Sequence, residues 1–528
     1  INQIYGYDLN PLSLFLAQFN LLYLLKDFGG EFRLNLYRGN SLFESESLPA
    51  HQFDLVISNP PWYTYRDIQD PAEQERIKNL ATELKIKPLP KNILNIEIST
   101  LFFYHAKARF MKPGAHIFFV ITKGVITGSH ASRFRNFRGF RRVEIWRFDS
   151  QIENIFNIDF ICIHAEKGTE ENTIYTKEIP SFLFTLPDSA TSISYFDPIT
   201  LVKGKRDLFV PFKVDTRGKR RYTGKLIPKH LHKTLLPVEE SPYKKLFHKG
   251  ADLNPRTLIF VEAKNHRQKT EKLATITPDP RVFKRAKKPW DKKIYTEEEV
   301  PKKYLFNVVK STELLRFFIY DHYTVFLPLE KPDLRFEPDQ LPERARSFYE
   351  KINRHYLALK KSTTKNQSLM DNLNRWSKLI NERQVAPIKV VYNNSGSLLS
   401  AAVVQGDYLV TGDLSFYSTE SLEEAYYLAA ILNCPAMQEQ IKIKKSSRHI
   451  FKLPFSVGIK KFNPSNQNHL KLAALGKKAE VIAKDVFLEY KKFKEKTLSK
   501  RTLQKRIQQA LNDLLTEINT IFLQDLSK

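Results

Sequence analysis

The sequence predicts an α/β protein in which a Rossmann-like, doubly wound sheet is followed by an α+β domain and a helical C-terminus. Three observations support this fold class. Short apolar strands alternate with helical patterns in residues 1–186, which is typical of a sheet with helices on both faces. The next region lacks that alternation, although strands and helices are still indicated. Residues 470–526 then show an almost continuous, lysine-rich helical pattern.

The elements expected in the first region follow one another as strand and helix. Helices are predicted over residues 10–28 and 95–114, the second closed by Pro113-Gly114. Strands are predicted over residues 2–9, 32–40, 53–59 and 115–122, and a further strand pair over 143–149 and 159–167. This order implies a mostly parallel sheet.

Three of the predicted strands end on a polar residue. Asp8, Asn40 and Asn59 each stand at the carboxyl end of an apolar run. Ligands of open α/β sheets bind beyond the carboxyl ends of the strands. We therefore expect these three side chains to line one pocket.

The chain has 528 residues, too many for one hydrophobic core, so two or three domains are expected. The predicted divisions are the α/β domain, a linker or extension, an α+β domain and a helical segment, over residues 1–186, 187–241, 242–469 and 470–528. Within the third of these, residues 388–404 contain two strand-like runs around an Asn-Asn-Ser-Gly turn, which predicts a hairpin.

The net charge is +27 and the pI is near 9.7, which favours a polyanionic partner. Nucleic acid is favoured over an anionic membrane, because the apolar runs are strand-length and too short to span a bilayer. The basic run at residues 213–225 is equally well explained as a solvated loop or as a DNA contact.

The cysteines and the N-terminal sequence indicate the cellular compartment of the protein. Cys162 and Cys434 belong to no Cys-x-x-Cys pair or Cys/His cluster, which argues against disulfides and a zinc site. No secretory pattern opens the sequence. A reducing cytoplasm and a protein without a metal are expected.

The run from Asn59 to Trp62, Asn-Pro-Pro-Trp, ends a core strand on a rigid turn. Pro60 and Pro61 each fix φ, so neither strand nor helix continues through them. An amine conjugated to an aromatic ring, as in adenine, is a poor nucleophile. The Asn59 side-chain oxygen and the Pro60 carbonyl could accept its two N–H groups, while Trp62 offers a flat face to a flipped base.

This turn resembles motif IV of the S-adenosylmethionine-dependent amino-methyltransferases of the adenine-N6 type. The resemblance implies that Asp8, in Tyr-Asp-Leu-Asn-Pro, holds the ribose hydroxyls of S-adenosylmethionine. It implies that Asn40 and Ser41 contact the adenine of the cofactor. The family has Gly-Asp-Ser/Ala-Leu at this turn, so the Asn40 amide replaces the usual carboxylate. It also implies that Phe156 packs against the target base, although an ordinary core phenylalanine is the competing interpretation.

The resemblance extends to the target-recognition region of large restriction–modification adenine methyltransferases, over scattered parts of residues 242–485. The motif order is that of the gamma arrangement. It implies a double-stranded DNA partner and makes Arg256, Arg448 and Lys452 candidate DNA contacts. Each of the three is equally well explained as a surface charge.

One departure from the family concerns its glycine-rich cofactor loop, Asp-Pro-x-x-Gly-x-Gly, which should precede Asp8 by some tens of residues and is not in this sequence. The chain is therefore expected to be N-terminally truncated and inactive alone. A nuclease domain or subunit is a further expected partner in the parent system.

The leading hypothesis is sequence-specific methylation of adenine N6 in DNA, in restriction–modification or phage defence. Two other enzymatic hypotheses are methylation of adenine in RNA and methylation of a protein glutamine. A non-catalytic DNA-binding or specificity protein derived from a methyltransferase is the alternative from another class. Cytosine-C5 chemistry would require a nucleophilic cysteine after a proline, which neither cysteine provides.

Overall fold

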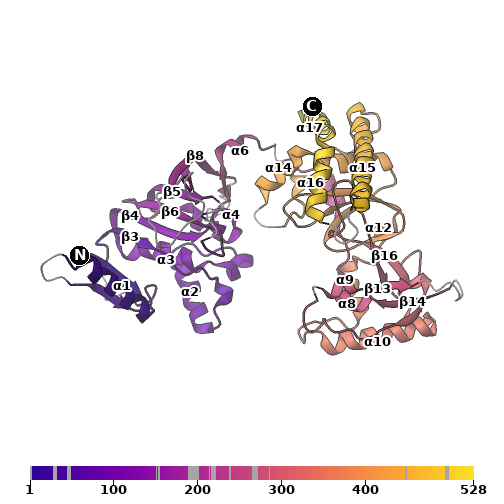
Figure 1. Cartoon of the computed structure of the whole chain (residues 1–528), viewed down its shortest axis with the longest axis horizontal. Helices are drawn as coiled ribbons and strands as arrows, with labels where there is room; N and C mark the ends of the chain where they lie inside the picture. Colours follow the sequence, from indigo (N-terminus) through magenta and orange to yellow (C-terminus); the bar gives the residue numbers. More distant parts are fainter. Residues whose placement is uncertain are drawn as a thin grey trace. The chain divides into compact units, whose positions relative to one another are not determined.

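The computed structural model describes residues 3–27, 33–44, 49–149, 152, 155–187, 201–212, 214–215, 222–236, 239–264, 272–284, 286–445, 449–493 and 499–527. The chain forms two compact units, Ile1–Thr234 and Leu235–Lys528. Figure 1 shows the helices and strands of both units, and each unit has hydrophobic clusters of its own. The mixed α/β architecture with several sheets agrees with the predicted class.

The first unit is built on a seven-stranded sheet in the order β11-β8-β7-β5-β6-β4-β3. Its strands are β3 (Phe53–Ser58), β4 (Met111–Thr122), β5 (Phe140–Phe148), β6 (Phe160–Lys167), β7 (Ile179–Thr185), β8 (Val202–Pro211) and β11 (Leu226–Pro228). Only the β3–β4 and β5–β7 pairs are parallel. The expectation of a mostly parallel sheet is therefore wrong for this sheet. The reason is that β6 enters antiparallel between β4 and β5.

A separate two-stranded parallel sheet is formed by β1 (Tyr5–Asp8) and β2 (Asn35–Arg38), which α1 (Pro11–Leu25) connects. The Tyr5 ring meets the Phe53 ring of β3 edge-on at 5.1 Å, so this small sheet lies beside the β3 edge. Asn10 caps α1 through its side-chain oxygen, which accepts from Leu12 N, and Pro11 occupies the first helical position.

The third helix ends earlier than its sequence pattern predicts. α3 (Ile98–Arg109) is followed directly by β4, and Pro113 and Gly114 lie inside that strand. There the register shifts, because Phe53 is opposite Met111 whereas Leu55 is opposite His116. Gly114 adopts φ +81°, a conformation that favours glycine, and Pro113 is tolerated because it lies at this irregularity of the ladder.

One face of the seven-stranded sheet carries the core of the first unit. Side chains of α3, α2 (Pro71–Glu83) and the central strands pack together, including Ile77, Phe103, Ile117, Phe119 and Ile145. The remaining elements of this unit are short: α4 (Gly124–Thr127), α6 (Lys229–Lys233), β9 (Val214–Asp215), β10 (Tyr222–Thr223) and the 3-10 turns Tyr65–Asp67, Pro90–Asn95, Ser129–Ala131 and Phe134–Asn136.

The second unit contains two sheets. The first has the order β12-β21-β18-β19 and the second the order β15-β14-β13-β17-β16-β20. Their strands are β12 (His248–Lys249), β13 (Phe260–Lys264), β14 (Leu273–Pro278), β15 (Glu298–Pro301), β16 (Leu305–Val309), β17 (Tyr323–Phe326), β18 (Ile388–Asn393), β19 (Ala401–Gln405), β20 (Tyr408–Val410) and β21 (Leu414–Ser418). β18 and β19 pair antiparallel, so the predicted hairpin is confirmed.

The helices of the second unit pack against both sheets. They are α7 (Tyr243–Leu246), α8 (Arg256–Ile259), α9 (Pro280–Phe283), α10 (Glu343–Leu359), α11 (Leu369–Leu373), α12 (Glu382–Val385), α13 (Leu422–Asn433), α14 (Pro435–Lys444), α15 (Gln467–Phe493), α16 (Lys500–Ala510) and α17 (Asn512–Ser527), with 3-10 turns at Lys302–Tyr304, Pro338–Gln340, Arg375–Ser377 and Leu453–Ser456. Side chains of α10 share one core with the six-stranded sheet. A second core joins α13–α17 to β18 and β19.

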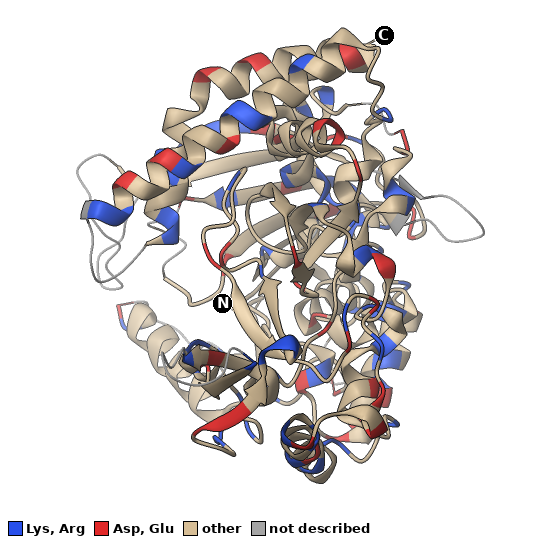
Figure 2. Cartoon of the chain, turned by 90° about the vertical axis from the view of Figure 1, so that its right-hand side faces the viewer, with Lys and Arg blue, Asp and Glu red and all other residues tan. Residues whose placement is uncertain are grey.

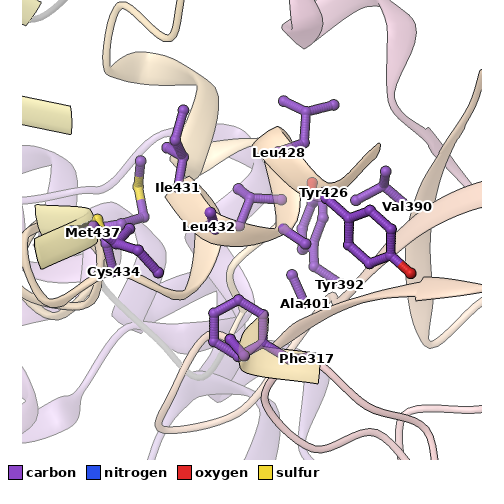
Figure 3. Packing of buried hydrophobic residues seen from close by; sticks show 14 of the residues in the cluster. Phe317, Val390, Tyr392, Ala401, Tyr426, Leu428, Ile431, Leu432, Cys434 and Met437 are labelled. Carbon is purple, nitrogen blue, oxygen red and sulfur yellow. Dashed lines mark hydrogen bonds between the residues drawn. The ribbon is translucent and has the colours of Figure 1, made fainter. Parts of the chain in front are cut away.

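Figure 3 shows this second core, in which α13 lies over the β18–β19 hairpin. Tyr426, Leu428 and Ile431 of α13 pack with Val390 and Tyr392 of β18 and with neighbouring side chains. The helical C-terminal stretch is thus part of a packed core. Along its helices, Lys and Arg are interspersed with Asp and Glu (Figure 2). Among the described residues, no helix is both long enough and apolar enough to cross a bilayer.

Candidate functional site: a rigid turn at the end of β3

The Asn-Pro-Pro-Trp turn begins directly after β3, which ends at Ser58. The chain beyond it is held by antiparallel contacts, since Tyr65 N donates to Ile96 O at 2.9 Å and Ile98 N donates to Tyr63 O at 3.1 Å. Two fixed φ angles and these bonds make the turn stiff. Pro60 is buried, whereas Asn59 is exposed.

The two acceptors of the turn, Asn59 Oδ1 and the Pro60 carbonyl oxygen, have no partner in the described part of the chain. Among the described residues, none donates a hydrogen bond to the Asn59 side chain or to the Pro60 carbonyl oxygen. The Asn59 amide, which has hydrogen-bond donors and an acceptor, is therefore available to bind a ligand.

Trp62 is fixed by the neighbouring strand and by aromatic rings. Its Nε1–H donates to Val120 O of β4 at 3.3 Å. Its ring stacks on Phe160 at 6.2 Å and meets Phe156 edge-on at 4.8 Å. The structure thus brings together Trp62 and Phe156. Phe156 is 37% exposed, so the interpretation as an ordinary core phenylalanine is wrong.

Asp8 and Asn40 lie together at the carboxyl edge of the β1–β2 sheet. Gly39 N donates to Asp8 O at 3.1 Å, which joins the two strand ends. The exposed Asp8 carboxylate accepts from Asn10 N at 2.7 Å. Since Asn10 caps α1, the competing interpretation of Asp8 as the helix cap is wrong. The Asn40 side-chain oxygen accepts from Leu42 N at 3.1 Å and keeps one lone pair.

The turn after β2 is anchored to the core of the first unit. Leu42 is buried in that core, and Arg76 of α2 lies 4.0 Å from the centre of the Phe43 ring. The Ser41 backbone is hydrogen bonded to His105, whose pKa is lowered mainly by burial. No described contact joins Asp8 or Asn40 to Asn59, so the predicted residues form two neighbouring groups, one on each sheet.

A polar cluster beside the turn was not predicted from the sequence. The Glu97 carboxylate accepts from Thr122 Oγ1, at the carboxyl end of β4, and contacts His130 Nε2 at 2.7 Å. Glu97 also forms an antiparallel bridge with Thr64, two residues after Trp62. No sequence motif marks these residues, because they are separated by up to 66 positions and are brought together only by the folding of the chain.

The three predicted DNA contacts fall in different places in the second unit. Arg256 lines a pocket and lies 4.0 Å from Asp413. Lys452 is exposed, and its ammonium donates to the Lys244 carbonyl at 2.7 Å. Arg448 lies outside the described residues, as does most of the basic run at 213–225. No described contact joins Arg256 to Lys452.

The two cysteines are unsuited to nucleophilic chemistry. Cys162 and Cys434 are buried free thiols, and burial raises the pKa of each to about 12. A thiol with a raised pKa is protonated near neutral pH and is a weak nucleophile. In the described part of the chain, no group of three His, Cys, Asp or Glu residues could hold a metal ion.

Comparison with known proteins gives one family match and several structural ones. Residues 2–156 match the family model described as Eco57I restriction-modification methylase. No curated protein matches significantly. The chain is similar to the Type IIL restriction-modification enzyme MmeI, solved in complex with DNA, with a TM-score of 0.51 and 12% identity over 99% of this chain and 63% of that one.

Two further solved structures are similar. One is the DrdV–DNA complex, with a TM-score of 0.44 and 12% identity over 90% of this chain and 50% of that one. The other is the type IIG restriction endonuclease BpuSI, with a TM-score of 0.35 and 13% identity over 100% of this chain and 61% of that one.

The match to MmeI shows a shared fold, and this chain spans 63% of that enzyme's length. The family-model match over residues 2–156 confirms the resemblance to restriction–modification methylases for that part of the chain.

Proposed function

We propose that this chain is the methylating and DNA-binding part of a restriction–modification enzyme that transfers a methyl group from S-adenosylmethionine to adenine N6 in double-stranded DNA. The observation that carries this proposal is the rigid turn after β3. Its Asn59 amide and Pro60 carbonyl are unpaired among the described residues and stand beside aromatic rings.

The proposed role of the turn is to make an aromatic amine reactive. Asn59 Oδ1 and Pro60 O would each accept one N–H of the adenine amino group. This withdraws the nitrogen lone pair from the ring and favours a tetrahedral nitrogen. Because both acceptors sit on a turn with fixed φ, they need no reorganisation as positive charge develops on that nitrogen. The proton lost from the amine passes to water or to a nearby acceptor.

The residues present fit part of S-adenosylmethionine. That cofactor supplies an electrophilic methyl group when bound. The exposed Asp8 carboxylate, with only one described donor on it, suits two ribose hydroxyls, and the turn at Asn40 and Ser41 suits the adenine ring. The glycine-rich loop expected from the resemblance would supply the remaining contacts.

For the target base, Phe156 and Trp62 have different proposed roles. One face of Trp62 is occupied by Phe160, and its indole N–H is bonded to β4, so Trp62 mainly fixes the turn. Phe156 is the more exposed ring and offers the better face for an unstacked base. Stacking on an aromatic side chain contributes about 1–3 kcal/mol per base.

The open sheet edges support a Rossmann-like fold with one further strand between β1 and β3. β1 pairs only with β2 and β3 only with β4 among the described strands. Leu55 and Ile57 of β3 are 53% and 67% exposed, and none of the 15 residues of α1 is buried although most are apolar. An added strand and its helix would cover these side chains and align Asp8 with Asn59.

The second unit is proposed to recognise the DNA target. In this proposal residues 1–186 form the catalytic domain, 187–241 the linker or extension, 242–469 the target-recognition domain and 470–528 its helical segment. β8 and β11, within the linker or extension, join the catalytic sheet. A nuclease domain or subunit in the parent system and a cytoplasmic location complete the proposal.

The experiment on the cofactor site is replacement of Asp8 by alanine. We expect the affinity for S-adenosylmethionine to fall by about 1–3 kcal/mol, because charge-assisted hydrogen bonds to the ribose are lost. Isothermal titration calorimetry would measure this in a full-length protein that carries the expected cofactor loop. Asp54→Ala is the matched control, since Asp54 is an exposed carboxylate of the same unit whose partner is Lys112. Equal cofactor affinity of Asp8→Ala and wild type would refute the assignment of Asp8.

A further inference from the structure

A pocket of about 670 Å³ lies in the second unit, between α8, α9, the end of β16 and the end of α10. Lysines and arginines dominate its charged lining, whereas Glu313 is the one carboxylate among the described lining residues. Its walls also include the rings of Trp290, Tyr323 and Tyr356. Such a lining repels cations and attracts anions.

Most of the cations of this pocket lack an acidic partner. Lys284, Lys287, Lys288, Lys310 and Lys361 form no ion pair with any described residue. Arg281, by contrast, is neutralised by Asp279 at 2.7 Å and Asp321 at 3.0 Å. The unpaired charges come from segments far apart in the sequence and converge on one pocket.

Two buried residues of the pocket, Thr257 and Lys310, have polar atoms without a hydrogen-bond partner among the described residues. Thr257 is 5% exposed, and its Oγ1 has no hydrogen-bond partner among the described residues. Lys310 is 4% exposed, and its ammonium lies over the Tyr323 ring, 4.3 Å from the ring centre, without a described hydrogen bond. Burial lowers the pKa of Lys310. The buried Thr257 hydroxyl has no described hydrogen-bond partner, and the buried Lys310 ammonium has an aromatic contact but no described ion pair or hydrogen bond. Buried polar groups of this kind destabilise a protein unless a ligand satisfies them.

We propose that this pocket holds backbone phosphates of the DNA, with the Thr257 hydroxyl and the Lys310 ammonium as the innermost donors. This inference rests on the proposed function, because it assumes that duplex DNA is the substrate. Five unpaired lysines exceed the charge of one phosphodiester, so successive phosphates of an extended polyanion fit better than a single small anion. Arg256, a DNA contact by resemblance, lines the same pocket.

The test is a fluorescence-anisotropy titration of the full chain on duplex DNA at several salt concentrations. Each phosphate contact contributes a slope of about −0.9 to log K against log salt. Lys310→Met should therefore make the slope shallower by about 0.9, and Lys287→Gln with Lys288→Gln by up to about 1.8. Lys477→Gln with Lys478→Gln is the control, since these exposed lysines lie on α15, outside the pocket.

The Thr257→Val variant distinguishes phosphate binding from a purely structural role of the hydroxyl. Its affinity for DNA should fall about tenfold with the slope unchanged, because a donor to a charged group is lost but no charge is. Its midpoint of thermal unfolding should not fall, because the hydroxyl that is removed has no partner in the protein.

The outcomes separate this inference from the proposed function. If the wild type binds DNA with a steep slope while the pocket variants bind as the wild type does, the pocket assignment falls and the proposed function stands. If the α15 control changes the slope as much as the pocket variants, the assignment also falls. Pocket-dependent binding of ATP together with pocket-independent binding of DNA would assign the pocket to a free nucleotide and overturn the inference. A wild type that does not bind DNA would overturn both.

Discussion

Replacing Asn59 with alanine is expected to abolish methyl transfer. The substitution removes one of two fixed acceptors for the adenine amino group, and loss of one preorganised polar group typically lowers kcat by about 10²–10³. Asn59 is exposed and has no hydrogen-bond partner among the described residues, so the midpoint of thermal unfolding should stay unchanged. DNA affinity should remain within a few-fold, because the amide orients the base and adds little to backbone binding.

The assay is transfer of a labelled methyl group to duplex DNA by the full-length protein with the expected cofactor loop. Gln69→Ala is a suitable control, because Gln69 is an exposed amide of the same unit beyond the turn. An Asn59→Ala protein that keeps most of its activity would refute the proposed role of the turn. A protein that loses activity together with stability would indicate that the amide is structural.

Duplex DNA binding by the chain should fall by roughly 10³–10⁵ between 50 and 200 mM salt. This follows if six to ten lysines or arginines each neutralise one phosphate, at a slope of about −0.9 per contact. The net charge of +27 and the unpaired lysines of the pocket in the second unit motivate this magnitude. Fluorescence anisotropy at constant temperature, with only the salt concentration varied, measures it.

Measuring the same salt dependence for the compact unit Leu235–Lys528 and for the whole chain shows which unit contains the phosphate contacts. Most of the salt dependence should remain in that unit, since the phosphate contacts require neither cofactor nor the Asn59 turn. A flat salt response of the whole chain would mean that its excess charge serves something other than DNA. A steep response that disappears in the isolated unit would place the contacts in the first unit instead.

Local chemistry explains which elements could be predicted from the sequence. β1, β2 and β3 lie where the sequence predicts them, just before or at Asp8, Asn40 and Asn59. They could be predicted because the polar residues and prolines that end each strand follow it directly in the sequence. The start of α1 could be predicted for the same reason, since Asn10 and Pro11 are local start signals.

Features that depend on long-range pairing could not be predicted in this way. Pro113 and Gly114 usually end helices, and here they lie in β4 because the register shift opposite β3 accommodates them. The antiparallel entry of β6 leaves no mark in the sequence. The Glu97 cluster and the basic pocket assemble residues distant along the chain, and each residue alone has the appearance of an ordinary surface or core position.

The most direct test of adenine-N6 methylation is nucleoside analysis of the methylated DNA. Duplex DNA would be incubated with the full-length protein and labelled S-adenosylmethionine, digested to nucleosides and examined by mass spectrometry. The proposed role of the Asn59 turn predicts that the label appears in N6-methyl-2′-deoxyadenosine. The Asn59→Ala substitution should remove that label. Label in N4- or C5-methylcytosine, or in protein rather than DNA, would contradict it.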